Sequence, residues 1–106
     1  MISRKDFVFT IGYEGSTAVV DGTLKRRYGS LTTEQLAEKK LYKQAVSSAV
    51  YEAFSAGQEP ESAGALQRVL ELYNRDAPKK IGSPEELKRT FGVQEIPSGI
   101  GRVTVI

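Results

Sequence analysis

The fold is decided by Leu31–Phe54, LTTEQLAEKKLYKQAVSSAVYEAF, which holds a helix start, an apolar stripe and a change of phase between them. Thr32 stands three residues before Gln35, which is the spacing of a capping box, where each side chain bonds the backbone N–H of the other residue. Leu31 and Leu36 then occupy the two positions of a hydrophobic staple. These signals predict that a helix begins at Thr32 or at the next residue.

A second helix is predicted by apolar residues that repeat at helical spacing over residues 42–54. They fall at i, i+3, i+4, i+7, i+8, i+11 and i+12, and they are Tyr42, Ala45, Val46, Ala49, Val50, Ala53 and Phe54. In one straight helix, Glu38 and Lys39 would point into this stripe, where unpaired charges are costly to bury. We therefore expect a break near 39–41, between a short helix and a longer one.

The same segment resembles the helix-turn-helix of bacterial regulators, whose first helix often reads Leu-Thr-x-Glu-x-Leu-Ala-Glu. Residues 31–38 match that pattern, and 45–47, Ala-Val-Ser, echo the second helix. The turn lacks the glycine that is often found there, and the spacing to Ala-Val-Ser is one residue short. The resemblance implies base contacts from the outward face of the second helix and phosphate contacts from lysines beside it. The residues are Lys39, Lys40, Lys43, Gln44, Ser47, Ser48 and Tyr51. A capped helix followed by a core helix with a polar outer face explains the same residues.

Strands are predicted towards both ends of the chain. Residues Asp6–Tyr13 alternate in the period-two pattern of a half-buried strand. One side of this strand is apolar and carries Phe7, Phe9 and Ile11. A turn at Glu14-Gly15 leads into a returning strand, Thr17–Asp21, so the two form a β-hairpin. The β-branched run Arg102–Ile106 predicts a terminal strand that joins this sheet.

Three further helical segments complete the expected fold. They are 24–28, closed by Gly29; 62–75; and the segment from the Ser83-Pro84 start to Phe91. The turn-rich segment 96–101 is expected to be a loop. The sequence therefore predicts one α+β domain over residues 1–106. In it, the N-terminal hairpin and the C-terminal strand form a small antiparallel sheet packed against three to four helices. Six aromatic residues are expected in the core: Phe7, Phe9, Tyr42, Phe54, Tyr73 and Phe91.

The composition narrows the chemistry, because the 106 residues include no cysteine and no histidine. Thiolate nucleophiles, disulfides, and zinc, haem and iron–sulfur sites are thus effectively excluded, as is catalysis by Ser-His or Cys-His pairs. Carboxylate, lysine, tyrosine or Mg²⁺-assisted chemistry stays open, yet no pair of carboxylates has a spacing that implies an acid and a base. We expect no catalytic residue, no cofactor and no metal. No membrane span or signal segment is indicated, so a cytoplasmic protein is expected.

The net charge is +2, and the densest basic run is Lys25, Arg26 and Arg27. This run is either a solvated surface turn or a contact for phosphate or an acidic partner. The leading hypothesis is a non-enzymatic binding or interaction protein, acting through a protein surface or a small-ligand cleft between sheet and helices. Its expected partner is another protein or a second copy, because open sheet edges are commonly paired. The alternative is a small nucleic-acid-binding regulator that uses the basic run and the 31–54 segment. An enzyme comes third.

Overall fold

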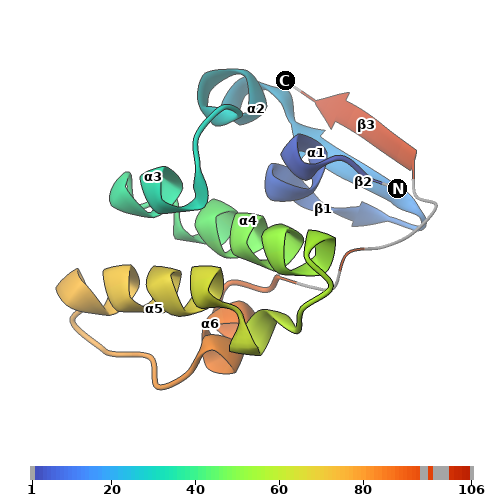
Figure 1. Cartoon of the computed structure of the whole chain (residues 1–106). Helices are drawn as coiled ribbons and strands as arrows, with labels where there is room; N and C mark the ends of the chain where they lie inside the picture. Colours follow the sequence, from blue (N-terminus) through green and yellow to red (C-terminus); the bar gives the residue numbers. More distant parts are fainter. Residues whose placement is uncertain (1, 94–95, 97–100, 106) are drawn as a thin grey trace.

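The computed structural model describes residues 2–93 and 96, together with the backbone of 101–105. In this part of the chain, α4 crosses the middle of the molecule (Figure 1). The sheet and α1 lie on one side of it, and α5 and α6 lie on the other. The fold of these described residues is α+β, as the sequence predicts, although it has six α-helices rather than three or four. In chain order the elements are α1 Arg4–Val8, β1 Thr10–Glu14, β2 Thr17–Asp21, α2 Gly22–Tyr28, α3 Thr33–Glu38, α4 Tyr42–Ser55, the 3₁₀ turn η1 Pro60–Ser62, α5 Gly64–Asp76, α6 Pro84–Thr90 and β3 Gly101–Val105.

The predicted helix start and the predicted break are both confirmed. Thr32 caps α3 in a full capping box with Gln35. The break follows because Lys40 takes a left-handed backbone conformation, with φ of 63°. The N–H of Leu41 then donates to the carbonyl of Leu36 at 3.0 Å, the closing hydrogen bond of a Schellman motif. Lys40 therefore occupies the position that usually holds glycine, and α4 starts in a new direction.

The predicted hairpin is confirmed from Thr10 onwards, but its first strand is shorter than expected. Residues 6–8 belong to α1 instead, because the Ser3 side chain accepts a hydrogen bond from the N–H of Asp6 and caps a short helix. The strands pair antiparallel, and their register shifts between Thr10 and Gly12. This bulge displaces Ile11 from the alternation, so that 52% of Ile11 is exposed. The expectation that Ile11 lies on the apolar side is therefore wrong.

The C-terminal strand runs in the opposite direction to the expectation. β3 pairs with β2 in parallel, and the strand order is β1-β2-β3. A parallel partner needs a long crossover, which the helical segment between β2 and β3 provides. Most of the loop expected over 96–101 lies outside the described residues, as does Ile106 of the expected strand.

The core forms around the apolar stripe of α4. Its alanines and valines are buried between α1, α3 and α5. Tyr42, Tyr73 and Phe91 pack together at one margin of this core, with ring centroids 5.0 to 6.3 Å apart. Phe54 is 49% exposed, contrary to the prediction, because at 100° per residue it falls at the outer margin of the stripe. In the part of the chain that the structure describes, no helix is long and apolar enough to cross a bilayer.

Replacing Lys40 with glycine is expected to stabilise the fold by about 0.5–1 kcal/mol. A left-handed conformation costs a non-glycine residue about 1–2 kcal/mol, and the greater freedom of glycine in the unfolded chain offsets part of the gain. Urea unfolding of Lys40→Gly measures the change. Lys39→Gly is the control, and it is expected to destabilise, because Lys39 has a φ of −84°. A Lys40→Gly variant that is less stable than the parent would contradict the assigned turn.

Candidate anion-binding site

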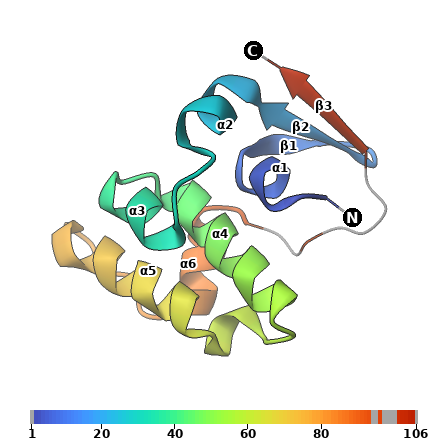
Figure 2. The same cartoon turned by 45° about the horizontal axis from the view of Figure 1, so that its top comes forward.

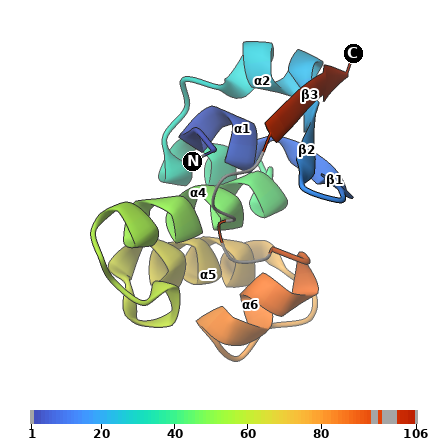
Figure 3. The same ribbon diagram turned by 90° about the vertical axis from the view of Figure 1, so that its right-hand side faces the viewer.

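The outward face that the helix-turn-helix resemblance predicts for α4 is covered by α1 (Figure 3). Ser47 is 5% exposed and Ser48 is fully buried. The Ser48 hydroxyl accepts a hydrogen bond from Arg4 Nη2 at 2.7 Å and shares another with Thr33 Oγ1 at 2.8 Å. The expectation that the two serines face solvent is therefore wrong. The physical reason is their small size, which lets α1 approach α4 closely.

Tyr51 is also turned away from the expected open face. Its hydroxyl donates to the carbonyl of Ile2 at 2.8 Å, and its ring centroid lies 5.9 Å from that of Phe7. Tyr51 is half-buried between the N-terminal segment and α4, so it too was wrongly placed at the surface. Among the other implied contacts, Lys39 and Lys40 are exposed in the break between the helices. Lys43 and Gln44 are half-buried in the first turn of α4.

The predicted basic run, in contrast, borders a hollow. Figure 2 shows α1 and α2 side by side next to the sheet. A hollow of about 330 Å³ at these two helices is lined by Lys5 from α1 and by Gly22, Lys25, Arg26, Gly29 and Ser30 from α2 and the turn that follows it. Lys39, Lys40 and Lys43 do not line it. The structure therefore adds Lys5 to the basic run and separates that run from the lysines of the 31–54 segment.

Local sequence signals position the basic side chains of this hollow. The Asp21 carboxylate accepts a hydrogen bond from the N–H of Leu24 at 3.1 Å and caps α2 directly after β2. At the other end, a Cβ on Gly29 would lie 2.4 Å from the carbonyl oxygen of Lys25 and 3.4 Å from Cδ of Lys5. Glycine is therefore required where the end of α2 meets α1.

The basic side chains near the hollow differ in whether they form an ion pair. Lys25 Nζ lies 2.6 Å from Oδ1 of Asp6, whose side chain is 8% exposed, so this lysine ties α2 to α1. Lys5, Arg26 and Arg27 take part in none of the ion pairs found among the described residues. Arg27 lies outside the hollow, with its guanidinium carbon 5.9 Å from the ring centroid of Tyr28. Lys5 and Arg26 therefore place two positive charges at the same hollow, and neither is in an ion pair with another described residue.

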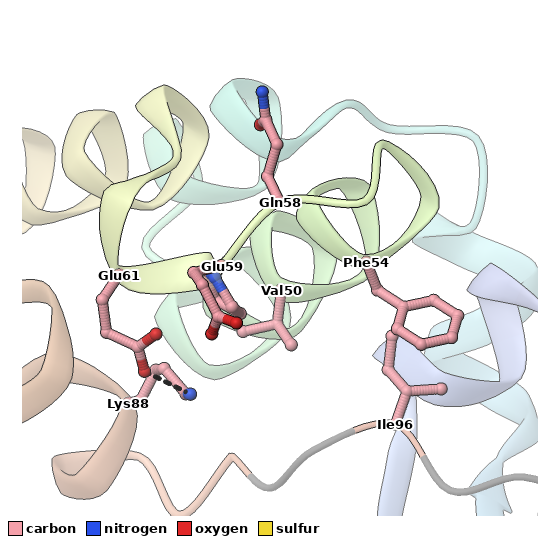
Figure 4. A pocket seen from close by; sticks show the side chains of 8 residues that line it. Val50, Phe54, Gln58, Glu59, Glu61, Lys88 and Ile96 are labelled. Atoms are coloured by element: carbon pink, nitrogen blue, oxygen red, sulfur yellow. Dashed lines mark hydrogen bonds and ion pairs between the residues drawn. The ribbon is translucent and has the colours of Figure 1, made fainter.

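A second hollow lies where α4, η1 and α6 meet (Figure 4). Its volume is about 290 Å³. Glu61 of η1 and Lys88 of α6 form an ion pair of 2.8 Å at one end, and Phe54 and Ile96 lie at the other. The hydrogen bond from Lys88 lowers the pKa of Glu61. Sequence reasoning missed this groove, because its two ion-pair partners are 27 residues apart. In the described ranges, no group of acidic side chains is arranged to hold a metal ion.

Comparisons with known proteins give no match for this chain: no protein-family model, no curated protein and no solved structure is significantly similar to it.

The ion pair between Glu61 and Lys88 is expected to make stability depend on pH. Because the pKa of Glu61 is lower in the folded state than its usual 4.5, the carboxylate stabilises the fold above that value. The contribution is lost as the pH falls through the lowered pKa. We expect Glu61→Gln to cost up to about 1 kcal/mol near neutral pH, the range for a partly exposed pair. Urea unfolding across the acidic range measures this.

At the acid end of that range, the stabilities of the parent and of Glu61→Gln are expected to converge. Glu71→Gln is the matched control, since Glu71 lies on the exposed side of α5 and joins no ion pair of the described residues. A difference between the parent and Glu61→Gln that stays constant with pH would contradict the role of the carboxylate charge.

Proposed function

We propose that this protein is a non-enzymatic binding protein whose hollow between α1 and α2 takes an acidic segment of a protein partner. The observation that carries the proposal is the convergence of Lys5 and Arg26 on one opening, with neither side chain in an ion pair of the described residues. The proposal involves no cofactor and no metal. It keeps the cytoplasm as the expected location, since a fold without disulfides does not depend on an oxidising compartment.

The chemistry of these two side chains suits carboxylates. A guanidinium such as that of Arg26 offers paired N–H donors that match the two oxygens of a carboxylate. The ammonium of Lys5 adds a second positive charge from the neighbouring helix. Lys25 is already bound to Asp6, so its main contribution is to hold the two helices together. The hollow therefore fits a few carboxylates at close range.

A nucleic acid is the alternative partner, and the arrangement of charges favours it less. A duplex carries one negative charge per about 1.7 Å of its axis, and basic proteins usually follow it with a long stripe of cations. Here the cations gather at one hollow, and the face of α4 that would read bases is covered by α1. Lysines of the 39–43 segment keep their predicted role as phosphate contacts only under this alternative.

Binding of an acidic probe is expected to depend on Lys5 and Arg26. The probe is a fluorescent peptide of ten glutamates, and anisotropy is measured at low and physiological salt beside a labelled DNA duplex. Removing both charges in Lys5→Gln/Arg26→Gln is expected to weaken peptide binding roughly tenfold, on the basis of two partly exposed ion pairs. Lys79→Gln is the control, because Lys79 is exposed in the linker before α6 and does not line the hollow.

Two results would overturn this proposal. One is the absence of peptide binding even at low salt. The other is tighter binding of the duplex with a steep salt dependence, which would favour the nucleic-acid alternative.

A second copy of the chain is a further protein partner that one observation favours. β1 is an outer strand of the sheet in the described chain, and Ile11 at its bulge is 52% exposed. Pairing β1 with its twofold equivalent would satisfy backbone groups at this edge and cover Ile11. β3 pairs with β2 on the side opposite β1, so it leaves the outer edge of β1 open for this contact.

The dimer is tested by light scattering over a range of protein concentrations. The parent is expected to approach the mass of two chains as concentration rises, while Ile11→Lys stays at the mass of one chain. Phe54→Lys, at the second large apolar side chain that is exposed among the described residues, is expected to dimerise like the parent. A parent that remains monomeric at high concentration would contradict the dimer and leave the binding hollow unaffected.

A further inference from the structure

The groove between α4, η1 and α6 has two chemically different ends. Figure 4 shows Phe54 and Ile96 next to each other at one end, and Glu61 pointing towards Lys88 at the other. Val50 of α4 lines the groove between the two ends. The volume of about 290 Å³ is close to the lower limit for small-molecule pockets. A ligand that fills the groove therefore needs both an apolar part and a polar part.

The charge of the groove favours a ligand whose polar group is positively charged. Among the described residues that line it are two carboxylates, Glu59 and Glu61, and one ammonium, Lys88, which leaves one negative charge in excess. The pKa of Glu61 is lowered, so this side chain is ionised at neutral pH. Lys88 is only 15% exposed and is already bound to Glu61 at 2.8 Å. The carboxylate of Glu59 belongs to none of the ion pairs among the described residues.

The aromatic ring of Phe54 makes the other end of the groove suitable for the apolar body of a ligand. Phe54 leaves 49% of its surface exposed, although a phenyl side chain gains by being covered. An aromatic ring on a ligand would gain from edge-to-face or offset contact with this phenyl group. An anionic ligand would be repelled by the excess negative charge of this described lining.

We propose that this groove binds a small organic ammonium ion with an apolar body. The apolar body packs on Phe54 and Val50, and the ammonium group bonds Glu59. The site shares no residue with the basic hollow between α1 and α2, so the inference goes beyond the function proposed above and does not depend on it.

Three matched probes test the proposal on the full chain: 2-phenylethylamine, 2-phenylethanol and phenylacetate, which differ mainly in the charge of the polar end. Each is titrated into ¹⁵N-labelled protein, and amide shifts are followed by NMR. The amine is expected to produce saturable shifts at the end of α4 and in η1, with a millimolar Kd. The neutral alcohol is expected to bind at least roughly twofold more weakly, and phenylacetate is not expected to bind.

Variants then identify the groups responsible. Glu59→Gln is expected to weaken the amine roughly two- to fivefold, the range for one partly exposed ion pair. Phe54→Leu keeps an apolar side chain but removes the ring, and it is expected to weaken the amine by a similar factor, because the contact between the two aromatic rings is lost. Lys88→Gln removes the positive charge that neutralises Glu61 and makes the groove more negative, so it is expected to strengthen amine binding. Glu71→Gln, on α5 and outside the groove, is the matched control and is expected to change nothing.

Three outcomes would overturn the site. They are phenylacetate binding more tightly than the amine, amine shifts spread over the surface without saturation, and amine affinity unchanged in both Glu59→Gln and Phe54→Leu.

Discussion

One buried hydroxyl, that of Ser48, connects three helices and determines what α4 presents to its surroundings. Arg4 of α1 donates to this hydroxyl and to the carbonyl of Leu31, while Thr33 of α3 shares a hydrogen bond with it. Buried polar groups need such partners, because an unpaired donor or acceptor loses its hydration without compensation. The guanidinium of Arg4 therefore holds α1 against α4. With α1 in that place, α4 is a helix of the core. The face of α4 that carries Ser47 and Ser48 is covered by other parts of the chain and is not exposed to solvent.

The position of α1 also places the basic hollow, because Lys5 follows Arg4 directly in the chain. The short helix α1 thus covers one face of α4 through Arg4 and supplies the Lys5 ammonium to the hollow beside α2. The two hollows then carry opposite charge. Lys5 and Arg26 make the first positive, and Glu59 and Glu61 leave the second negative despite Lys88. A protein with a net charge of only +2 can therefore present two separate and chemically distinct surfaces.

Sequence reasoning found what local interactions determine. The capping box at Thr32, the break before α4 and the start of α6 at Ser83 each depend on residues within one helical turn, so they were predictable. The first helix was missed because Phe7 and Phe9 fit the alternation of a strand, while the competing signal was a single serine cap. The parallel direction of β3, the burial of Ser48 and the meeting of Glu61 with Lys88 all depend on contacts between distant segments. For the candidate site, the basic run 25–27 could be predicted from the sequence. The contribution of Lys5 could not, because it depends on α1 lying beside α2.

Gly29 gives the basic hollow a further property. Its φ of −62° is open to any residue, so nothing in the backbone conformation itself demands glycine. The demand comes from the carbonyl of Lys25, which leaves room for a hydrogen atom but not for a methyl group. Any larger side chain has to distort the last turn of α2, and this turn carries Lys25 and Arg26 of the hollow. The position of the α2 charges therefore depends on an uncharged residue at the helix end, and substitution of Gly29 would move Arg26 relative to Lys5 without altering either side chain.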